Sequence, residues 1–368
     1  MSGASSHADF LGRRWFGALD ALRASAISAV IVHHVVGSPR LGPVEVRGFL
    51  GVDVFFVLSG FLISTLLVRE REATGTIALG AFWARRARRI FPAYYTLLLL
   101  MALGLGLRPG SSNAAAFFGG LPYYATYTSN WVEVPKNPDG SESWMHLAWS
   151  LATEEQFYLA WPLVERLGAR PRTLTLGALV AVNLAVAVAW TGPRPDILQV
   201  TYLPLLVGVA LAHTLHRPGG FAWVTRWAGP RAAAPALAVV ALAVACARPG
   251  PVTGWPRAAF ALAAAALLAA LVVREDHGLS ALTRLAPLRR LGTVSYGMYL
   301  YHQVARYPVM RAFAVAGVAA PILQLPLVVA LTWALAELSF RTVERWFDPR
   351  ARARARARVS RGDADTGP

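Results

Sequence analysis

The stretch LDALRASAISAVIVHHVVG, residues 19–37, is apolar but carries ionisable side chains near both ends. Asp20 and Arg23 lie near its start, and His33 and His34 near its end. At about 100° per residue, the eleven steps from Arg23 return to within roughly 20° of the same helix face, so Arg23 and His34 share that face. The helical rise separates them by roughly 16 Å. Because a charge inside a membrane helix is costly, the pair is a candidate site; the alternatives are an ion pair of Arg23 with Asp20 and a structural hydrogen bond for His34.

The next apolar run, GVDVFFVLSGFLI, holds one acid, Asp53. If the two runs form an antiparallel hairpin, Asp53 and His34 lie at matching depth. A carboxylate beside an imidazole fixes its tautomer and raises its basicity, as a general base requires. The simpler role of Asp53 is to stabilise a helix N-terminus. Ser59 and Gly60 fit close helix packing by small residues.

The segment FWARRARRIFPAYY places four arginines within five residues, just before a third apolar run: Arg85, Arg86, Arg88 and Arg89. Guanidinium groups at this density suit bidentate binding of phosphates. We therefore predict a phosphate-bearing substrate at this end of the run. An ordinary positive-inside anchor would give the same local pattern.

Two later apolar runs also carry polar side chains. Glu154 and Glu155 are adjacent within HLAWSLATEEQFYLAWP, so they lie on different faces of one helix. At least one should meet a cation or line a polar cavity, because burying both unpaired is expensive. The run LGTVSYGMYLYHQVARYP holds His302 in mid-helix, with Tyr299 one turn before it.

Long apolar helices must position these residues. Of the 368 residues, 55% are hydrophobic, and a helix needs about 20 apolar residues to cross a bilayer. The sequence predicts an all-α fold, a polytopic membrane helical bundle of about ten transmembrane helices. Their predicted ranges are 17–37, 50–68, 90–107, 147–165, 173–191, 197–214, 231–248, 258–273, 290–308 and 320–341.

The positively charged residues cluster in the connections between the apolar runs. The net charge is +16, Lys136 is the only lysine, and the arginines cluster between apolar runs, which predicts membrane topology and no nucleic-acid partner. With ten spans the arginine-rich connections share one side, so we expect the inner (plasma) membrane, crossed several times, with both termini in the cytoplasm. The connections assigned to the opposite side carry seven arginines that weaken the contrast: Arg40, Arg47, Arg108, Arg194, Arg248, Arg257 and Arg311.

The chain divides into a cytoplasmic N-terminal segment at 1–16, a transmembrane domain at 17–345 and a basic tail at 346–368. The tail contains RARARARARVS, which predicts a disordered arm near anionic membrane lipids. We expect 108–146 to be re-entrant or to lie on the surface, since a further span would move the arginines of 166–172 to the other side. Cys246 is the only cysteine, so an intramolecular disulfide or a multi-cysteine metal cluster is excluded.

Taken together, these blocks resemble the acyltransferase-3 family of multi-span membrane O-acyltransferases. LDALRA followed by His34 is similar to the family's Arg–ten residues–His element, and GVDVFFVLSGFLI to its second block. RRARRIFP resembles the Arg-x-x-Arg block, whose register before Ile-x-Pro points to Arg86 and Arg89. WSLATEEQFYLAWP resembles the fourth block, and VSYGMYLYH the late Ser-Tyr…Tyr-Leu-x-His element. His146 sits three residues before Trp149, where the family pattern expects two, and this weakens a role for His146.

The resemblance implies an acyl-CoA donor, acetyl-CoA by default, an alcohol acceptor and no metal. His34 would be the general base, Arg86 and Arg89 would hold the CoA phosphates, and Arg23 would steer the donor or stabilise charge. The predicted catalytic residues are His34, Asp53, Arg23 and Glu154. The predicted donor-binding residues are Arg86, Arg89, Arg85 and Arg88. The predicted substrate-binding residues are Tyr158, Tyr299 and His302.

Acceptors used in the family are hydroxyl-bearing glycans, glycolipids and small glycosides such as macrolide antibiotics, and we expect one of these. Some relatives carry an extracytoplasmic hydrolase-like domain after the membrane core; this chain stops at Pro368, which predicts the stand-alone form. Two other functions remain open. A transporter or flippase of a glycan or lipid-linked substrate also uses intramembrane charges, although the sequence has no inverted repeat. A scaffold would not need so many buried ionisable groups.

Overall fold

The computed structural model describes residues 6–36, 47–108, 110–132, 134–136, 143–189, 202–247, 254–318 and 320–347. The tail beyond 347, including the predicted disordered arm, lies outside these ranges, as do the connections 37–46, 190–201 and 248–253. Within the described ranges the fold is helical and contains no strand. The elements are α1 (His7–Gly12), α2 (Ala18–Val36), η1 (Gly48–Leu50), α4 (Gly51–Thr74), α5 (Leu79–Gly106), α6 (Ser112–Ala125), α7 (Ala148–Glu165), α8 (Ala169–Ala189), α10 (Leu203–Leu215), α11 (Pro218–Ala228), α12 (Ala233–Cys246), α13 (Trp255–Val273), α14 (Ser280–Thr283), α15 (Ala286–Thr293), α16 (Ser295–Val315), α17 (Pro321–Ser339), the π-helical turn η2 (Phe340–Glu344) and α18 (Arg345–Phe347).

Each predicted helix has a counterpart, but ten transmembrane spans are not confirmed. Among the described residues, five helices are long and apolar enough to cross a membrane: α2, α4 with η1, α5, α13, and α17 continued through α18. The pair α11 and α12, bent by 80°, makes six if it counts as one span. The other predicted spans are shorter or more polar; α10 has only 13 residues, and α7 carries Glu154, Glu155 and Glu165.

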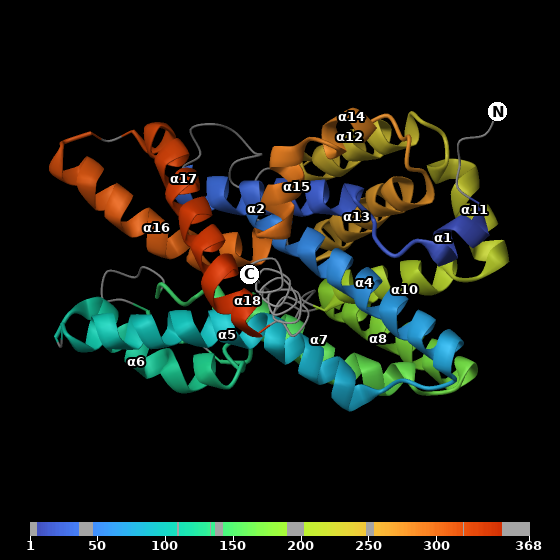
Figure 1. Cartoon of the computed structure of the whole chain (residues 1–368), viewed down its shortest axis with the longest axis horizontal. Helices are drawn as coiled ribbons and strands as arrows, with labels where there is room; N and C mark the ends of the chain where they lie inside the picture. Colours follow the sequence, from blue (N-terminus) through green and yellow to red (C-terminus); the bar gives the residue numbers. More distant parts are fainter. Residues whose placement is uncertain are drawn as a thin grey trace, which may run out of the picture.

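The helices α2 and α4 run through the middle of the molecule and contribute to two apolar cores (Figure 1). The first core is completed by α5, α6, α7, α16, α17 and part of α10. The second is completed by α1, α10, α11, α12 and α13. Side chains of α2 and α4 are therefore held from both sides, as a site that needs fixed geometry requires.

The helices α4 and α10 cross in close contact, and the crossing depends on two glycines. A Cβ atom at Gly60 would lie 1.9 Å from the carbonyl oxygen of Leu205, and one at Gly208 would lie 2.1 Å from that of Val57. Small residues let two backbones approach in this way inside a membrane. The predicted packing role of Gly60 is confirmed.

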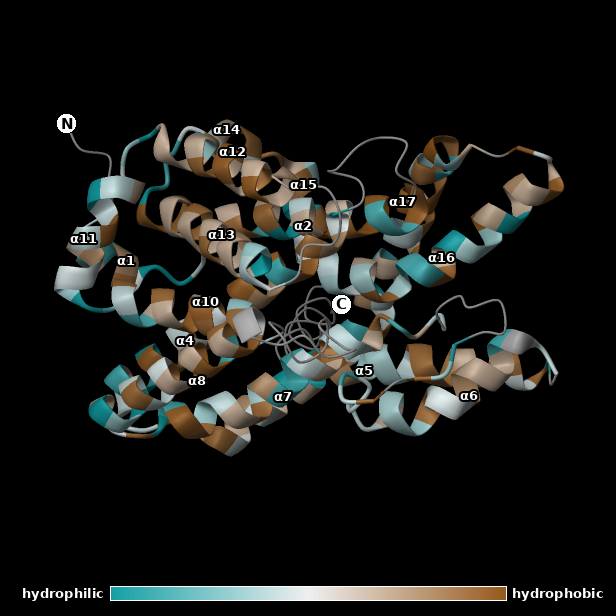
Figure 2. Ribbon diagram, turned by 180° about the vertical axis from the view of Figure 1, so that it is seen from behind, coloured by the Kyte–Doolittle hydropathy of each residue, from teal (hydrophilic) through white to brown (hydrophobic). Residues whose placement is uncertain are grey.

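The outward faces of several helices are apolar. Figure 2 shows hydrophobic residues along α12 and α17, where Val239 is 66% exposed and Leu323 58%. On α5, Leu99, Leu100 and Leu103 are each 58% exposed. Water would not favour such surfaces, whereas lipid does. The chain is therefore a membrane protein.

The segment 108–146, apart from residues 109, 133 and 137–142, forms α6 and a turn that folds back on the bundle. The Tyr94 hydroxyl of α5 donates to the carbonyl of Tyr124 at 2.8 Å, and the Tyr95 hydroxyl to that of Ala125 at 2.9 Å. With 14 residues, α6 rises roughly 21 Å, less than the bilayer core of about 30 Å. It is not among the helices long enough to span.

Candidate functional site

A cavity of about 290 Å³ lies between α2, α4, α5, α7 and α16, next to the segment that precedes α2. Its charged lining is mainly basic, with five arginines and two glutamates among the described residues: Arg14, Arg23, Arg69, Arg86, Arg89, Glu154 and Glu155. A concave site with this charge favours an anionic ligand.

The four clustered arginines of α5 have different environments. Arg86 and Arg89 line the cavity, and within the described part of the chain neither has a hydrogen-bond or ion-pair partner. Arg85 instead pairs with Glu70 at 3.2 Å, and the Nε of Arg88 donates to the carbonyl of Ala84 in its own helix at 3.0 Å. The register of the sequence block therefore selects the two arginines that face the cavity.

Arg23 both forms the local pair and lines the cavity. Its Nη1 lies 2.7 Å from Oδ1 of Asp20, the i,i+3 ion pair that the sequence left open as an alternative. The same side chain belongs to the cavity wall. Asp20 is buried, so the pair holds the guanidinium of Arg23 at the first turns of α2.

Glu154 is held by two hydroxyl groups on the cavity wall. Its carboxylate accepts hydrogen bonds from Ser59 of α4 and from Tyr158, one turn later on α7. The guanidinium of Arg86 lies 5.4 Å from the centre of the Tyr158 ring, within cation–π range. Glu155 lines the same cavity near Arg86. Both adjacent glutamates thus have polar neighbours, as expected because burying an unpaired carboxylate is costly.

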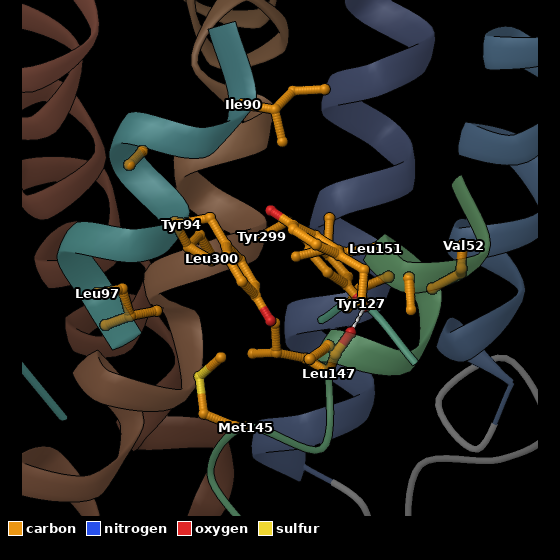
Figure 3. Close-up of a cluster of buried hydrophobic side chains, with 14 of the residues drawn as sticks. Val52, Ile90, Tyr94, Leu97, Tyr127, Met145, Leu147, Leu151, Tyr299 and Leu300 are labelled. Atoms are coloured by element: carbon orange, nitrogen blue, oxygen red, sulfur yellow. Dashed lines mark hydrogen bonds between the residues drawn. The ribbon is translucent and has the colours of Figure 1, made fainter. Parts of the chain in front are cut away.

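At another part of the wall, Tyr299 connects the cavity with the apolar core. Its hydroxyl lies 2.6 Å from Oγ of Ser150 and donates to the carbonyl of Leu147 at 3.2 Å. Figure 3 shows Tyr299 in the buried cluster together with Leu147 and Leu151. The aromatic ring is therefore fixed in place between the cavity and the residues behind it.

His34 lies outside the cavity lining but is linked to it by ring contacts. The ring centres of His34 and His302 are 4.8 Å apart, and those of His302 and Tyr299 are 5.7 Å apart. Nδ1 of His34 donates to the carbonyl of Val30 at 2.9 Å, and Nδ1 of His302 to that of Tyr299 at 2.6 Å. Because a carbonyl only accepts, these bonds leave the lone pair of each neutral ring on Nε2.

His302 itself is fully buried, and its Nε2 has no hydrogen-bond partner among the described residues. It stands between Tyr299 and His34 and does not line the cavity. The structure therefore places His302 behind the cavity wall, whereas Tyr158 and Tyr299, the other predicted substrate contacts, belong to the wall. His33 packs its ring 5.7 Å from Phe49.

The predicted pairing of Asp53 with His34 is wrong. Both oxygens of the Asp53 carboxylate accept from Nε of Arg257 on α13, at 3.0 and 3.1 Å, and both side chains are buried. On α4, Gly51 lies against the backbone of Ala26 of α2. Asp53, two residues later, is turned by about 200° and faces away from α2.

Comparison with known proteins identifies the family of the chain. A family model described as an acyltransferase domain matches residues 16–338, which include every predicted site residue. The chain belongs to the acyltransferase-3 family. No solved structure matches the chain. The family match covers the ring contacts and most of the cavity lining and of both cores; Arg14 and Trp15 of the lining and Phe10 of the second core precede it.

The relatives of this acyltransferase-3 chain include proteins named as peptidoglycan O-acetyltransferases. The peptidoglycan O-acetyltransferase OatA of Listeria monocytogenes is 31% identical over 90% of this chain and 56% of its own length. The putative peptidoglycan O-acetyltransferase YrhL of Bacillus subtilis is 31% identical over 90% of this chain and 55% of its own. A putative O-acetyltransferase of Staphylococcus aureus is 40% identical over 41% of this chain and 25% of its own. The chain spans about half the length of the first and second of these.

Several residues of this acyltransferase-3 cavity were missed or misread from the sequence. Ser59 was interpreted as a packing residue, yet it bonds Glu154; Ser150 received no role of its own, yet it bonds Tyr299. Trp15 and Arg69 were not considered, although both line the cavity. Their signal is weak, because a tryptophan or an arginine beside a membrane helix is usually an anchor. Among the described residues, no group of three His, Cys, Asp or Glu side chains is placed to hold a metal.

Proposed function

We propose that the chain is a membrane O-acyltransferase that transfers an acyl group, acetyl by default, from acyl-CoA to a hydroxyl group of a glycan or glycoside. One observation carries the proposal. A basic cavity ends at Tyr299, and two ring contacts lead from there to His34; the guanidinium groups of Arg86 and Arg89 on its wall have no hydrogen-bond or ion-pair partner among the described residues. The family match supports acyl transfer over the transporter that the sequence alone left open.

In this proposal the donor occupies the cavity. Phosphate groups bind Arg86 and Arg89, because charge-assisted bonds to guanidinium are the strongest that the site offers. The pantetheine arm runs towards Tyr299 and Ser150 and carries the thioester to the side where His302 and His34 lie. Arg23, fixed by Asp20, keeps positive charge beside this path.

His34 is the general base. Its Nε2 removes the proton of the acceptor hydroxyl while the oxygen attacks the thioester carbonyl carbon. The carbon–sulfur bond then breaks, and the imidazolium returns the proton to the departing thiolate. The bond from Nδ1 to the carbonyl of Val30 keeps the Nδ1 proton in place, so Nε2 is the nitrogen that accepts the proton and later returns it. Glu154 and Tyr158 belong to the donor wall and position Arg86; Asp53, paired with Arg257, has a structural role.

The acceptor is a hydroxyl-bearing glycan, and peptidoglycan is the first candidate. Two relatives are named for peptidoglycan O-acetylation. We also propose that the protein lies in the plasma membrane with both termini in the cytoplasm. A C-terminal fluorescent fusion should then be bright and a C-terminal alkaline phosphatase fusion inactive; the reverse pattern would contradict the topology.

The decisive experiment is acetyl transfer by the purified protein. Acetyl-CoA labelled in the acetyl group would be mixed with soluble peptidoglycan fragments, and label in the glycan measured. His34→Ala should lower the rate by about 10²–10⁴-fold, the usual contribution of a general base. His33→Ala is the control, because it removes the neighbouring imidazole. Near-normal turnover by a folded His34→Ala protein would reject the assignment.

The donor site has its own matched controls on the same helix. Arg86→Ala and Arg89→Ala should each raise the KM for acetyl-CoA at least about tenfold, because a charge-assisted bond contributes about 1.5–3 kcal/mol. Arg85→Ala and Arg88→Ala should change it little, since these arginines do not line the cavity. Equal effects of all four substitutions would remove the specific donor site.

A further inference from the structure

A second cavity adjoins the first where the chain enters α2. Its volume is about 250 Å³, and it shares Trp15 and Phe16 with the larger cavity. Its wall is also basic, with Arg13, Arg284 and Arg289 beside a single acid, Glu275. Trp15 therefore stands between two hollows that both carry excess positive charge.

The indole of Trp15 is unusually open for a side chain between two cavities. It is 56% exposed. The guanidinium of Arg289 lies over one face, 4.7 Å from the ring centre, and this guanidinium has no ion-pair or hydrogen-bond partner among the described residues. An aromatic plane beside an unpaired guanidinium is the arrangement on which a nucleotide base stacks while its phosphates find positive charge.

Trp15 also lies at the appropriate end of the proposed donor path. It precedes α2, whereas His34 lies 16 residues after the first residue of that helix, roughly 24 Å along the axis. Arg23 pairs with Asp20 at 2.7 Å, and the charges of Arg289 and Arg89 also act on this carboxylate. A donor whose thioester reaches His34 has its other end near Trp15.

We propose that Trp15 and Arg289 form the base-binding subsite for the nucleotide end of the donor. The inference rests on the proposed function and adds a site to it: the adenine ring stacks on the open indole, and Arg289 supports the phosphates together with Arg86 and Arg89. The competing explanation is that Trp15 only anchors the chain at the membrane interface.

The test is a binding measurement that does not depend on turnover. The full-length protein in detergent would be titrated calorimetrically with coenzyme A and, separately, with pantetheine, which lacks the nucleotide. Trp15→Leu should raise the Kd for coenzyme A about tenfold, as expected for loss of one stacked base, and leave binding of pantetheine unchanged. Trp15→Phe should restore most of the affinity because it keeps an aromatic face.

Trp223→Leu is the matched control. Trp223 is 58% exposed, lies on α11 and lines neither cavity. Trp223→Leu should leave the Kd for coenzyme A unchanged, whereas Arg289→Gln should raise that Kd. If wild-type protein does not bind coenzyme A, the proposed function fails. If wild-type protein binds it and Trp15→Leu binds it equally, or if Trp15→Leu weakens pantetheine to the same degree, the subsite is rejected and the anchor explanation stands. Should Trp15→Leu not fold, Trp15→Phe and Arg289→Gln decide the question.

Discussion

Arg257→Met should destabilise the protein strongly, because it leaves the Asp53 carboxylate buried without its partner. Asp53 is 0% exposed and Arg257 is 6% exposed. The only hydrogen bonds of the Asp53 carboxylate among the described residues come from this guanidinium. Removing one member of a buried ion pair costs about 3–5 kcal/mol. In a thermal melt of the solubilised protein, the midpoint should fall by on the order of 10 °C.

The double variant Asp53→Leu/Arg257→Met separates a structural role from a catalytic one. Replacing a buried ion pair by apolar side chains of similar size is often neutral or stabilising, so the midpoint should return close to the wild-type value. Acetyl transfer should return with it, because Asp53 faces α13 and not His34. Melting would be followed by size-exclusion chromatography of heated samples, and activity with labelled acetyl-CoA.

Two results would refute this reasoning. If Arg257→Met melts like wild type, the pair does not stabilise the fold. If the double variant is as stable as wild type but does not transfer acetyl groups, Asp53 takes part in the reaction, as the sequence first suggested.

Three further predictions test other parts of the structure. Gly60→Leu should prevent α4 from packing on α10, because even a Cβ atom would lie 1.9 Å from the Leu205 carbonyl, and the yield of folded protein in size-exclusion chromatography should fall to near zero. His302→Phe should keep the ring contact with His34 but lower kcat about tenfold or more with unchanged KM for acetyl-CoA, since it removes Nε2; an unchanged kcat would exclude His302 from the site. Hydrogen bonds from Arg274 and Arg231 lower the pKa of Asp276 from 3.8 to about 2, so this carboxylate stabilises the fold above about pH 4 and loses its effect as the pH falls towards 2; the difference in melting temperature between wild type and Asp276→Asn should shrink over that interval.

Helix positions were predictable because apolar runs of spanning length are a strong signal. The starts of α2, α4 and α7 lie within one residue of the predicted ranges. The number of transmembrane spans was not predictable, because the length of an apolar run alone does not separate a helix that crosses the membrane from one that is short or polar. The amphipathic α11 was missed for a related reason: with 11 residues, it lies inside an arginine-rich connection that the search for long runs treats as a loop.

Within the site, spacing along one helix was informative and relations between helices were not. The resemblance to the Arg-x-x-Arg block selected Arg86 and Arg89, and the adjacency of Glu154 and Glu155 in an apolar run predicted polar surroundings for at least one of them. Asp53 was matched to His34 by depth alone, which leaves the rotation of α4 undetermined. Its real partner, Arg257, is 204 residues away and was assigned to an outer connection. Arg47 is also buried, and its guanidinium donates to the carbonyl of Ala245. Because Arg47 and Arg257 are both buried inside the bundle, they explain part of the weak difference in charge between the two sides of the membrane.

The distance in sequence between Asp53 and Arg257 has a consequence for biogenesis. The two residues are 204 positions apart, so at about 5–20 residues per second the ribosome needs roughly 10–40 s to deliver the arginine after the acid. During that interval α4 resides in the insertion machinery or the bilayer with a carboxylate whose partner does not yet exist. The hairpin of α2 and α4 is thus synthesised early, but its buried ion pair forms only after α13 has been synthesised. Truncation before α13 should leave it susceptible to membrane proteases, and ion-pair closure marks the point at which the nascent chain becomes resistant.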